Sequence, residues 1–174
     1  KATTQFKQLK RFVSIRNDFV LKNDGDRIIL YPLDFIEAKF FILSPLQGFA
    51  LSTLDGKRKF PEIDAEFRSL FPDAEASLAN ILAGVDDMVR ENPTQSGIGR
   101  DGVLEQSDQP IQFSYCYDPR DFIVSVDKYN QIMQGVQTRM RLNSPICIMA
   151  FFTRRCQTNC IYCYAQRKRT PEMT

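Results

Sequence analysis

Three cysteines lie close together near the end of the sequence, where Cys156, Cys160 and Cys163 have the spacing C-x3-C-x2-C (the cysteine motif). The chain has five cysteines in all, and an odd number with such tight spacing is better explained by a metal site than by a disulfide framework. Directly before them, Ile146–Phe152 is continuously apolar, which is typical of a strand buried on both faces of a parallel sheet. Such a strand needs neighbouring strands, so we expect this chain to be a fragment whose sheet continues in further sequence.

The spacing of the cysteine motif favours a 4Fe-4S cluster. Three thiolates in one loop can hold three irons of the cluster and leave the fourth iron open. Ferredoxins that only carry electrons close all four corners with cysteine, and the nearest further cysteine, Cys147, lies within the expected strand. Two other interpretations stay open at this point: a zinc site with a distant fourth ligand, and reduced thiols that bind no metal.

The segment Thr153–Tyr164, with Tyr162 directly before the last cysteine, resembles the signature of the radical-SAM superfamily. The resemblance implies that residues 113–174 begin a partial (β/α) barrel whose first strand is Ile146–Phe152. It also implies that the cysteine motif holds a 4Fe-4S cluster, whose open iron binds S-adenosylmethionine with Tyr162 near the adenine. An electron from a reductant such as flavodoxin or ferredoxin would then cleave this cofactor to a 5'-deoxyadenosyl radical.

The absence of histidine excludes imidazole bases, Cys–His nucleophile pairs and histidine-ligated zinc. A net charge of +2 gives no general argument for a nucleic-acid partner. The first residues lack the pattern of a signal peptide, and the longest apolar run is far shorter than the ~20 residues that span a bilayer. We therefore expect no membrane partner and, with the thiols reduced, a location in the cytoplasm.

The N-terminal part of the sequence predicts three strands. Phe19–Leu21 and Arg27–Tyr31 are apolar stretches on either side of Asn23–Asp26, whose Asp-Gly pair is typical of a tight hairpin turn. A third apolar stretch, Lys39–Leu43, precedes Ser44-Pro45. Serine is a good N-cap and proline a good first helical residue, so we expect a helix to follow.

Three helices are expected after these strands. The first stops at Asp55-Gly56, and the second begins at Pro61. The third has the clearest helical period of the sequence, with these apolar residues at offsets of three, four and seven: Leu78, Ile81, Leu82, Val85, Met88 and Val89. Three strands followed by three helices predict an α+β, winged-helix-like domain over residues 12–92.

The composition changes after this domain. Residues 93–112 contain proline, glycine and serine with only isolated aliphatic side chains, which predicts a linker. Further along, the following apolar residues have the spacing of a helix: Tyr129, Ile132, Met133, Val136 and Met140. The sequence therefore predicts that a linker separates the first domain from the beginning of the barrel.

Four short segments, Tyr31-Pro32, Phe41–Ser44, Leu51–Gly56 and Phe60–Ile63, make the first domain similar to PqqD-like recognition elements. Such elements occur in radical-SAM maturases of ribosomally made peptides. The similarity implies that the leader of a precursor peptide adds as a strand beside the third strand, in a groove made with the third helix. The residues expected to bind this peptide are Lys39, Phe40, Phe41, Ile42, Leu43, Leu78, Leu82 and Val85.

Together the two resemblances predict the N-terminal part of a radical-SAM peptide maturase, whose first domain concentrates the substrate through its leader. One alternative is a radical-SAM enzyme that acts on RNA, but the third helix is acidic, with Asp87 and Glu91 on it, which is unfavourable for phosphate. A second alternative is a peptide-binding module without catalysis of its own. The basic residues beside the cysteine motif fit a solvated loop or a surface facing an anionic cofactor or peptide: Arg154, Arg155, Arg167, Lys168 and Arg169.

Overall fold

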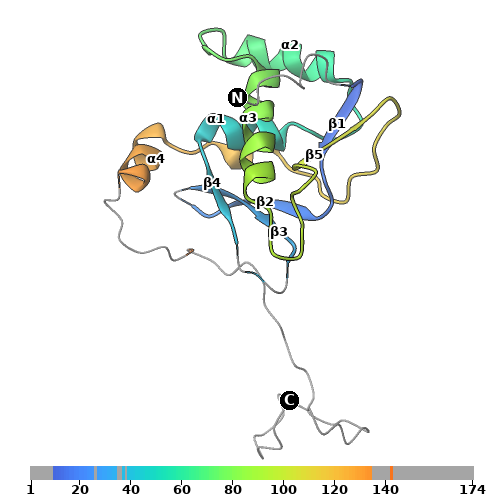
Figure 1. The fold of residues 1–174 in the computed structure, drawn as a ribbon. Coiled ribbons are helices and arrows are strands. Elements are labelled where there is room, and N and C mark those ends of the chain that lie inside the picture. Colours follow the sequence, from blue (N-terminus) through green and yellow to red (C-terminus); the bar gives the residue numbers. More distant parts are fainter. Residues whose placement is uncertain (1–9, 26, 35–36, 38, 135–141, 143–174) are drawn as a thin grey trace, which may run out of the picture. The chain divides into compact units, whose positions relative to one another are not determined.

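The computed structural model describes residues 10–25, 27–34, 37, 39–134 and 142 (Figure 1). The chain divides into two compact units, 1–141 and 142–174, and the elements described here all belong to the first. The described residues form an α+β fold with five strands, four α-helices and one 3-10 helix. In chain order these are β1 Phe12–Ile15, β2 Phe19–Asn23, β3 Ile28–Pro32, β4 Phe41–Leu43, α1 Pro45–Ser52, α2 Phe60–Leu70, α3 Leu78–Glu91, β5 Leu104–Ser107, η1 Pro119–Phe122 and α4 Val126–Met133.

One sheet has three antiparallel strands in the order β2–β3–β4. β2 and β3 form the predicted hairpin, whose turn is closed by a hydrogen bond from the Asp24 N–H to the Arg27 carbonyl (2.9 Å). The turn holds Gly25 at a positive φ of 89°, a conformation that glycine adopts without steric cost. β3 is the central strand of this sheet, and it is buried along its whole length. The third predicted strand is confirmed as β4, although it begins at Phe41 instead of Lys39.

The three helices predicted after the sheet are confirmed, and side-chain caps explain where two of them begin. At the start of α1, the Ser44 hydroxyl accepts the Gln47 N–H (3.2 Å) and the Gln47 side chain accepts the Ser44 N–H (2.9 Å). This reciprocal pair satisfies two donors that the first helical turn leaves without partners. At the start of α3, the Ser77 hydroxyl accepts the Asn80 N–H (3.3 Å).

The apolar faces of these helices form a hydrophobic core with the sheet. Leu78, Leu82 and Val85 on α3 are fully buried, and burial of each such side chain contributes about 1.5–3 kcal/mol to stability. α1 approaches β3 so closely that a Cβ on Gly48 would overlap the side chain of Ile28. The helical period read from the sequence therefore marks the face of α3 that packs into the core.

Residues 93–112, which the sequence predicted to be a linker, are folded. They contain β5, which pairs antiparallel with β1, a strand that the sequence did not predict. Val103 and Leu104 are buried. Glycines of this segment lie in hydrogen-bonded turns, as shown by the bond from the Gly102 N–H to the Gly99 carbonyl (2.9 Å). The segment 93–112, whose composition suggested a flexible linker, is therefore a compact connection.

A buried carboxylate on α3 holds this connection in place. Asp86 is 0% exposed and accepts hydrogen bonds from the backbone N–H groups of Val103 (2.7 Å) and Leu104 (2.9 Å). Its second oxygen accepts Nε of Arg90 (2.7 Å). A Cβ at position 102 would overlap the carboxylate, so Gly102 is required by space as well as by its φ of 82°. Charge-assisted hydrogen bonds thus join α3 to the start of β5.

The last described elements are η1 and α4. Three of the residues that predicted a helix lie in α4: Tyr129, Ile132 and Met133. The other two, Val136 and Met140, lie outside the described residues, as does the run Ile146–Phe152 that was expected to open a barrel. None of the helices that the structure describes has the length and apolar character needed to cross a bilayer.

We expect Asp86→Ala to lower the free energy of unfolding by about 3 kcal/mol, because two buried backbone N–H groups would lose a charged acceptor. Asp87→Ala is the matched control: Asp87 is the next residue on the same helix and is half-buried, so its loss should cost less than about 1 kcal/mol. Urea unfolding followed by circular dichroism measures both values. Equal destabilisation in the two variants would contradict the role assigned to Asp86.

Candidate functional site

The two edge strands of the three-stranded sheet differ in what lies beside them. β2 is accompanied by the segment 112–117 (the β2 cover), in which the Tyr117 hydroxyl accepts the Leu21 N–H (3.0 Å). The Ser114 N–H donates to the side chain of Asn17, just before β2 (2.9 Å). The β2 cover therefore occupies this edge through side-chain hydrogen bonds instead of regular strand pairing.

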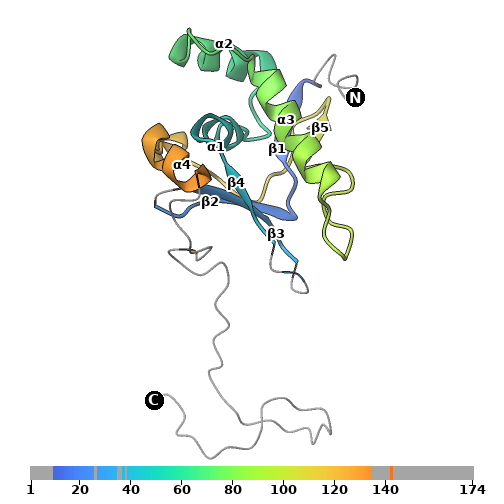
Figure 2. The same ribbon diagram turned by 60° about the vertical axis from the view of Figure 1, so that its left-hand side comes forward.

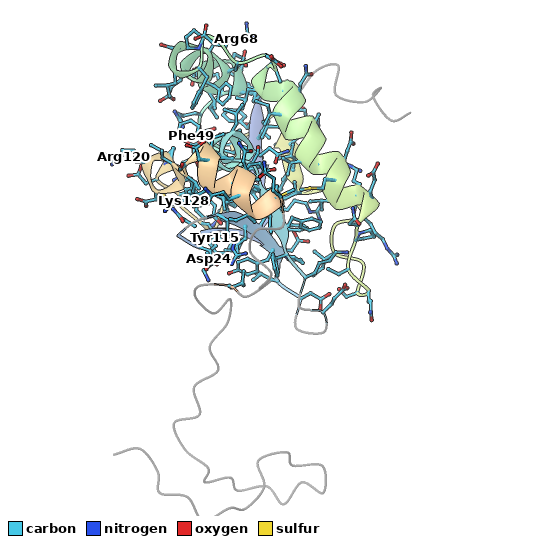
Figure 3. The ribbon with its side chains drawn as sticks, turned by 90° about the vertical axis from the view of Figure 1, so that its left-hand side faces the viewer. Asp24, Phe49, Arg68, Tyr115, Arg120 and Lys128 are labelled. Atoms are coloured by element: carbon cyan, nitrogen blue, oxygen red, sulfur yellow. The ribbon has the colours of Figure 1, made fainter. Side chains whose placement is uncertain are left out.

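Aromatic side chains pack along the β2 cover. Phe113, Tyr115 and Tyr117 are half-buried and alternate with exposed residues. The rings of Tyr115 and Tyr117 are stacked with centroids 6.1 Å apart, and Tyr117 meets Phe122 edge-on at 5.5 Å. Figure 3 labels Tyr115 on the side of the molecule where α4 lies in front. Another strand could pair with β2 only by displacing these contacts.

Burial raises the pKa of Tyr117 to about 12, although the hydrogen bond from the Leu21 N–H lowers it. Desolvation disfavours the charged phenolate, so the folded protein favours the neutral hydroxyl. At neutral pH the Tyr117 hydroxyl is therefore protonated, and its oxygen accepts a hydrogen bond from the Leu21 N–H of β2.

β4 is the other edge of the sheet, and within the described residues it pairs with β3 alone. Five predicted peptide-binding residues lie on or just before it: Lys39, Phe40, Phe41 and Ile42 are half-buried, and Leu43 is buried. Nζ of Lys39 donates to the Pro93 carbonyl after α3 (3.1 Å) and lies 5.8 Å from the centroid of the Phe41 ring. Lys39 therefore connects the start of β4 to the end of α3.

Two further hydrogen bonds hold the chain before β4 beside the loop after α3. The Ser96 hydroxyl donates to a carboxylate oxygen of Asp34 (2.6 Å), and the Gln95 N–H donates to a carboxylate oxygen of Glu37 (2.8 Å). With the Lys39 bond, they fix β4 and α3 in one relative position. An edge that is already ordered in this way loses little conformational entropy when a ligand binds.

Three residues of α3 that were expected to contact a peptide are part of the core. Leu78, Leu82 and Val85 are fully buried, so in this structure their side chains pack into the core and expose no surface to a ligand. They lie at the centre of the apolar face of the helix, and a side chain there packs against the sheet. A ligand beside β4 can reach only the border of this face.

Ile81, Gly84 and Met88 lie along one side of α3 (the α3 flank). Successive residues turn by about 100° around a helix, so these three lie across the helix from Asp86, which bonds to β5. Figures 1 and 2 both show β4 and β5 on opposite sides of α3. A Cβ on Gly84 would meet no atom within 4 Å, so there is open space beside it. The i, i+3, i+7 spacing at the edge of the apolar stripe is the sequence signal for this flank.

The cysteine motif, Tyr162, Cys147 and the neighbouring basic residues lie outside the described residues. The described residues contain no group of three or more His, Cys, Asp or Glu side chains that could hold a metal ion. No protein-family model, curated protein or solved structure matches the chain. The candidate site in the described part is therefore the free edge of β4 together with the α3 flank.

We expect the fold to lose stability as the pH rises from about 10 toward 12. Tyrosine in an unfolded chain releases its proton near pH 10, whereas folded Tyr117 keeps it until about pH 12. The folded state binds more protons in this window. The stability that protonated Tyr117 contributes in full below about pH 10 is therefore lost as the pH rises through the window.

Tyr117→Phe isolates this effect, because the variant lacks the titrating hydroxyl but keeps the ring. Urea midpoints of the wild type and the variant at pH 8, 10, 11 and 12 give the comparison, and the difference between them should shrink above pH 10. At pH 8 the variant should be less stable by about 1 kcal/mol, because the Leu21 N–H loses its acceptor. A constant difference between the two proteins at every pH would rule out this assignment.

Proposed function

We propose that this chain is the peptide-binding part of a radical-SAM peptide maturase, whose winged-helix-like first domain binds the leader of a ribosomally made precursor as an added strand along β4. One observation carries the peptide-binding part of the proposal. Within the described residues β4 is paired on one side, while the opposite edge of the same sheet lies under the β2 cover. Exposed sheet edges bind extended peptides through main-chain hydrogen bonds.

The side chains around β4 support an apolar, extended ligand. Phe41 and Ile42 are half-buried, so part of each remains available for contact, and Gly84 leaves space on the α3 flank. The outer face of α3 carries Asp87 and the exposed Glu91. These carboxylates are unfavourable for a phosphate backbone, which supports a peptide over the RNA alternative.

The catalytic part of the proposal rests on the spacing of Cys156, Cys160 and Cys163. This spacing suits a 4Fe-4S cluster with one open iron, and the resemblance to radical-SAM enzymes implies that Tyr162 would lie near the adenine of S-adenosylmethionine. Bound together, cluster and cofactor would supply the 5'-deoxyadenosyl radical, with flavodoxin or ferredoxin as the electron source. Binding of the leader at β4 would raise the concentration of substrate near this centre, and the reduced thiols fit a cytoplasmic enzyme.

We expect Gly84→Phe to weaken peptide binding at least about tenfold, a loss that corresponds to ~1.4 kcal/mol, because the ring would fill the open space on the α3 flank. The probes are peptides selected against the chain from a displayed library of random 16-residue sequences, and their affinities are measured by fluorescence anisotropy. Gly84→Ala is the matched control. It leaves the space open and should stabilise α3 by about 0.5–1 kcal/mol without changing the affinity.

A second variant tests the strand itself. Ile42→Pro removes a main-chain N–H from β4 and should weaken the same peptides, with circular dichroism confirming that the variant keeps its helices. Selected peptides that bind the wild type, Gly84→Phe and Ile42→Pro with equal affinity would show that β4 and the α3 flank are not the binding site.

We expect the triple variant Cys156→Ala, Cys160→Ala and Cys163→Ala to lose about four irons per chain relative to the wild type after anaerobic reconstitution. Iron and sulfide analysis with an absorption spectrum measures the difference in the full-length protein. Gly84→Phe is the control and should retain its iron, because the peptide site is separate from the cysteine motif. Equal iron in wild type and triple variant, or zinc in its place, would leave a peptide-binding module without a radical-SAM centre.

A further inference from the structure

A cavity of about 800 Å³ opens between α1, the end of α2 and the segment around η1 (the α1–α2 pocket). Its walls come from three separate parts of the chain: Leu46 and Phe49 on α1, Leu70 on α2, and Ile123 and Val126 after η1. Pockets that bind small ligands or side chains have volumes of roughly 300–1,000 Å³ and predominantly apolar walls. The α1–α2 pocket has both properties.

Apolar side chains gather at the mouth of this pocket. Leu70 is 55% exposed, Ile123 is 70% exposed and Val126 is 60% exposed. Two other large apolar side chains among the described residues are exposed, Leu33 and Met133, and they do not line the pocket. Exposed apolar side chains that cluster in this way mark an interaction site. Figure 3 looks onto this side of the molecule and labels Phe49 and Arg120, two residues of the pocket wall.

The charged groups at the rim are paired within the protein. Glu66 binds Arg58 (2.6 Å), and Asp118 binds Arg120 (2.5 Å). A charged ligand would have to compete with these pairs. The pocket therefore suits uncharged, apolar groups, which gain free energy by leaving water.

The pocket begins where β4 ends. Leu43 is the last residue of β4, and Pro45, two positions later, is the first residue of α1 and lines the pocket. A strand advances about 3.3 Å per residue. A strand paired with β4 therefore reaches the level of the pocket within about two residues of the end of the pairing.

We infer that the α1–α2 pocket binds one or two bulky apolar side chains of the same peptide that pairs with β4. The inference rests on the proposed peptide binding at β4. The peptide has two recognition parts: an extended segment that adds to the sheet, and leucine, isoleucine, methionine or phenylalanine side chains a few residues away that enter the pocket. The strand gives affinity through its backbone, whereas the pocket gives sequence selectivity.

Variants at exposed positions of the pocket test this inference without disturbing the core. The probes are the library peptides selected against the wild-type chain, with affinities measured by fluorescence anisotropy. Leu70→Asp and Ile123→Asp should each weaken binding at least about tenfold, as expected for truncation of a central apolar contact. Met133→Asp is the matched control: it is also largely exposed (58%) but lies outside the pocket, and should change the affinity less than about twofold.

A peptide in which the apolar residues outside the pairing segment are replaced by serine completes a double-mutant cycle. It should lose at least about tenfold affinity for the wild type and almost none for Ile123→Asp, where the contact is already absent.

Pocket variants that bind like Met133→Asp, while Gly84→Phe abolishes binding, would overturn the pocket inference and leave the β4 site in place. Binding that resists Gly84→Phe and Ile42→Pro would instead overturn the β4 site. Pocket variants that abolish self-association of the chain in light scattering, without affecting peptide affinity, would assign the pocket to a second copy and overturn the inference.

Discussion

The hydrogen bonds to the buried carboxylate of Asp86 hold the connection after α3 to the rest of the described fold. They join α3 to the start of β5, and through β5 to β1. Because a helix is stiff, a contact that fixes one side of α3 also fixes its opposite side, where Gly84 and Met88 lie. A buried charged acceptor with several donors tolerates little displacement. Asp86 therefore holds the side of α3 toward β5, while the hydrogen bonds of Lys39, Gln95 and Ser96 hold the loop after α3 beside the chain before β4.

The elements from β2 to α3 could be predicted because each carries a local signal. The Asp24-Gly25 turn and the Ser44 cap are examples, and each acts over a few residues. β1 and β5 could not be predicted in this way, because their pairing joins distant parts of the chain and no turn or helix cap directly beside them marks it. The polar residues Glu105 and Gln106 and the nearby glycines made β5 resemble a linker.

The candidate site was predictable from the sequence in part. The order of the strands makes β4 an edge, and its residues were identified. Leu78, Leu82 and Val85 lie in the core, because a hydrophobic period marks the buried face of a helix and does not identify its border. The contact of Tyr117 with β2 depends on one hydroxyl far along the chain, and no sequence pattern marks it. The cysteine motif is the opposite case, since its sequence signal is strong while its residues lie outside the described part.

The β2 cover has a consequence for assembly. A sheet with two open edges can pair with a neighbour on each side, and repetition of that pairing builds a filament. Here one edge is already taken by the chain itself, so strand pairing through this sheet can occur once per molecule. A strand that binds β4, whether from a peptide or from a second copy related by twofold symmetry, ends the sheet. The side chains that close β2 therefore limit pairing through the three-stranded sheet to one added strand, so a fibre cannot grow by repeated pairing along this sheet.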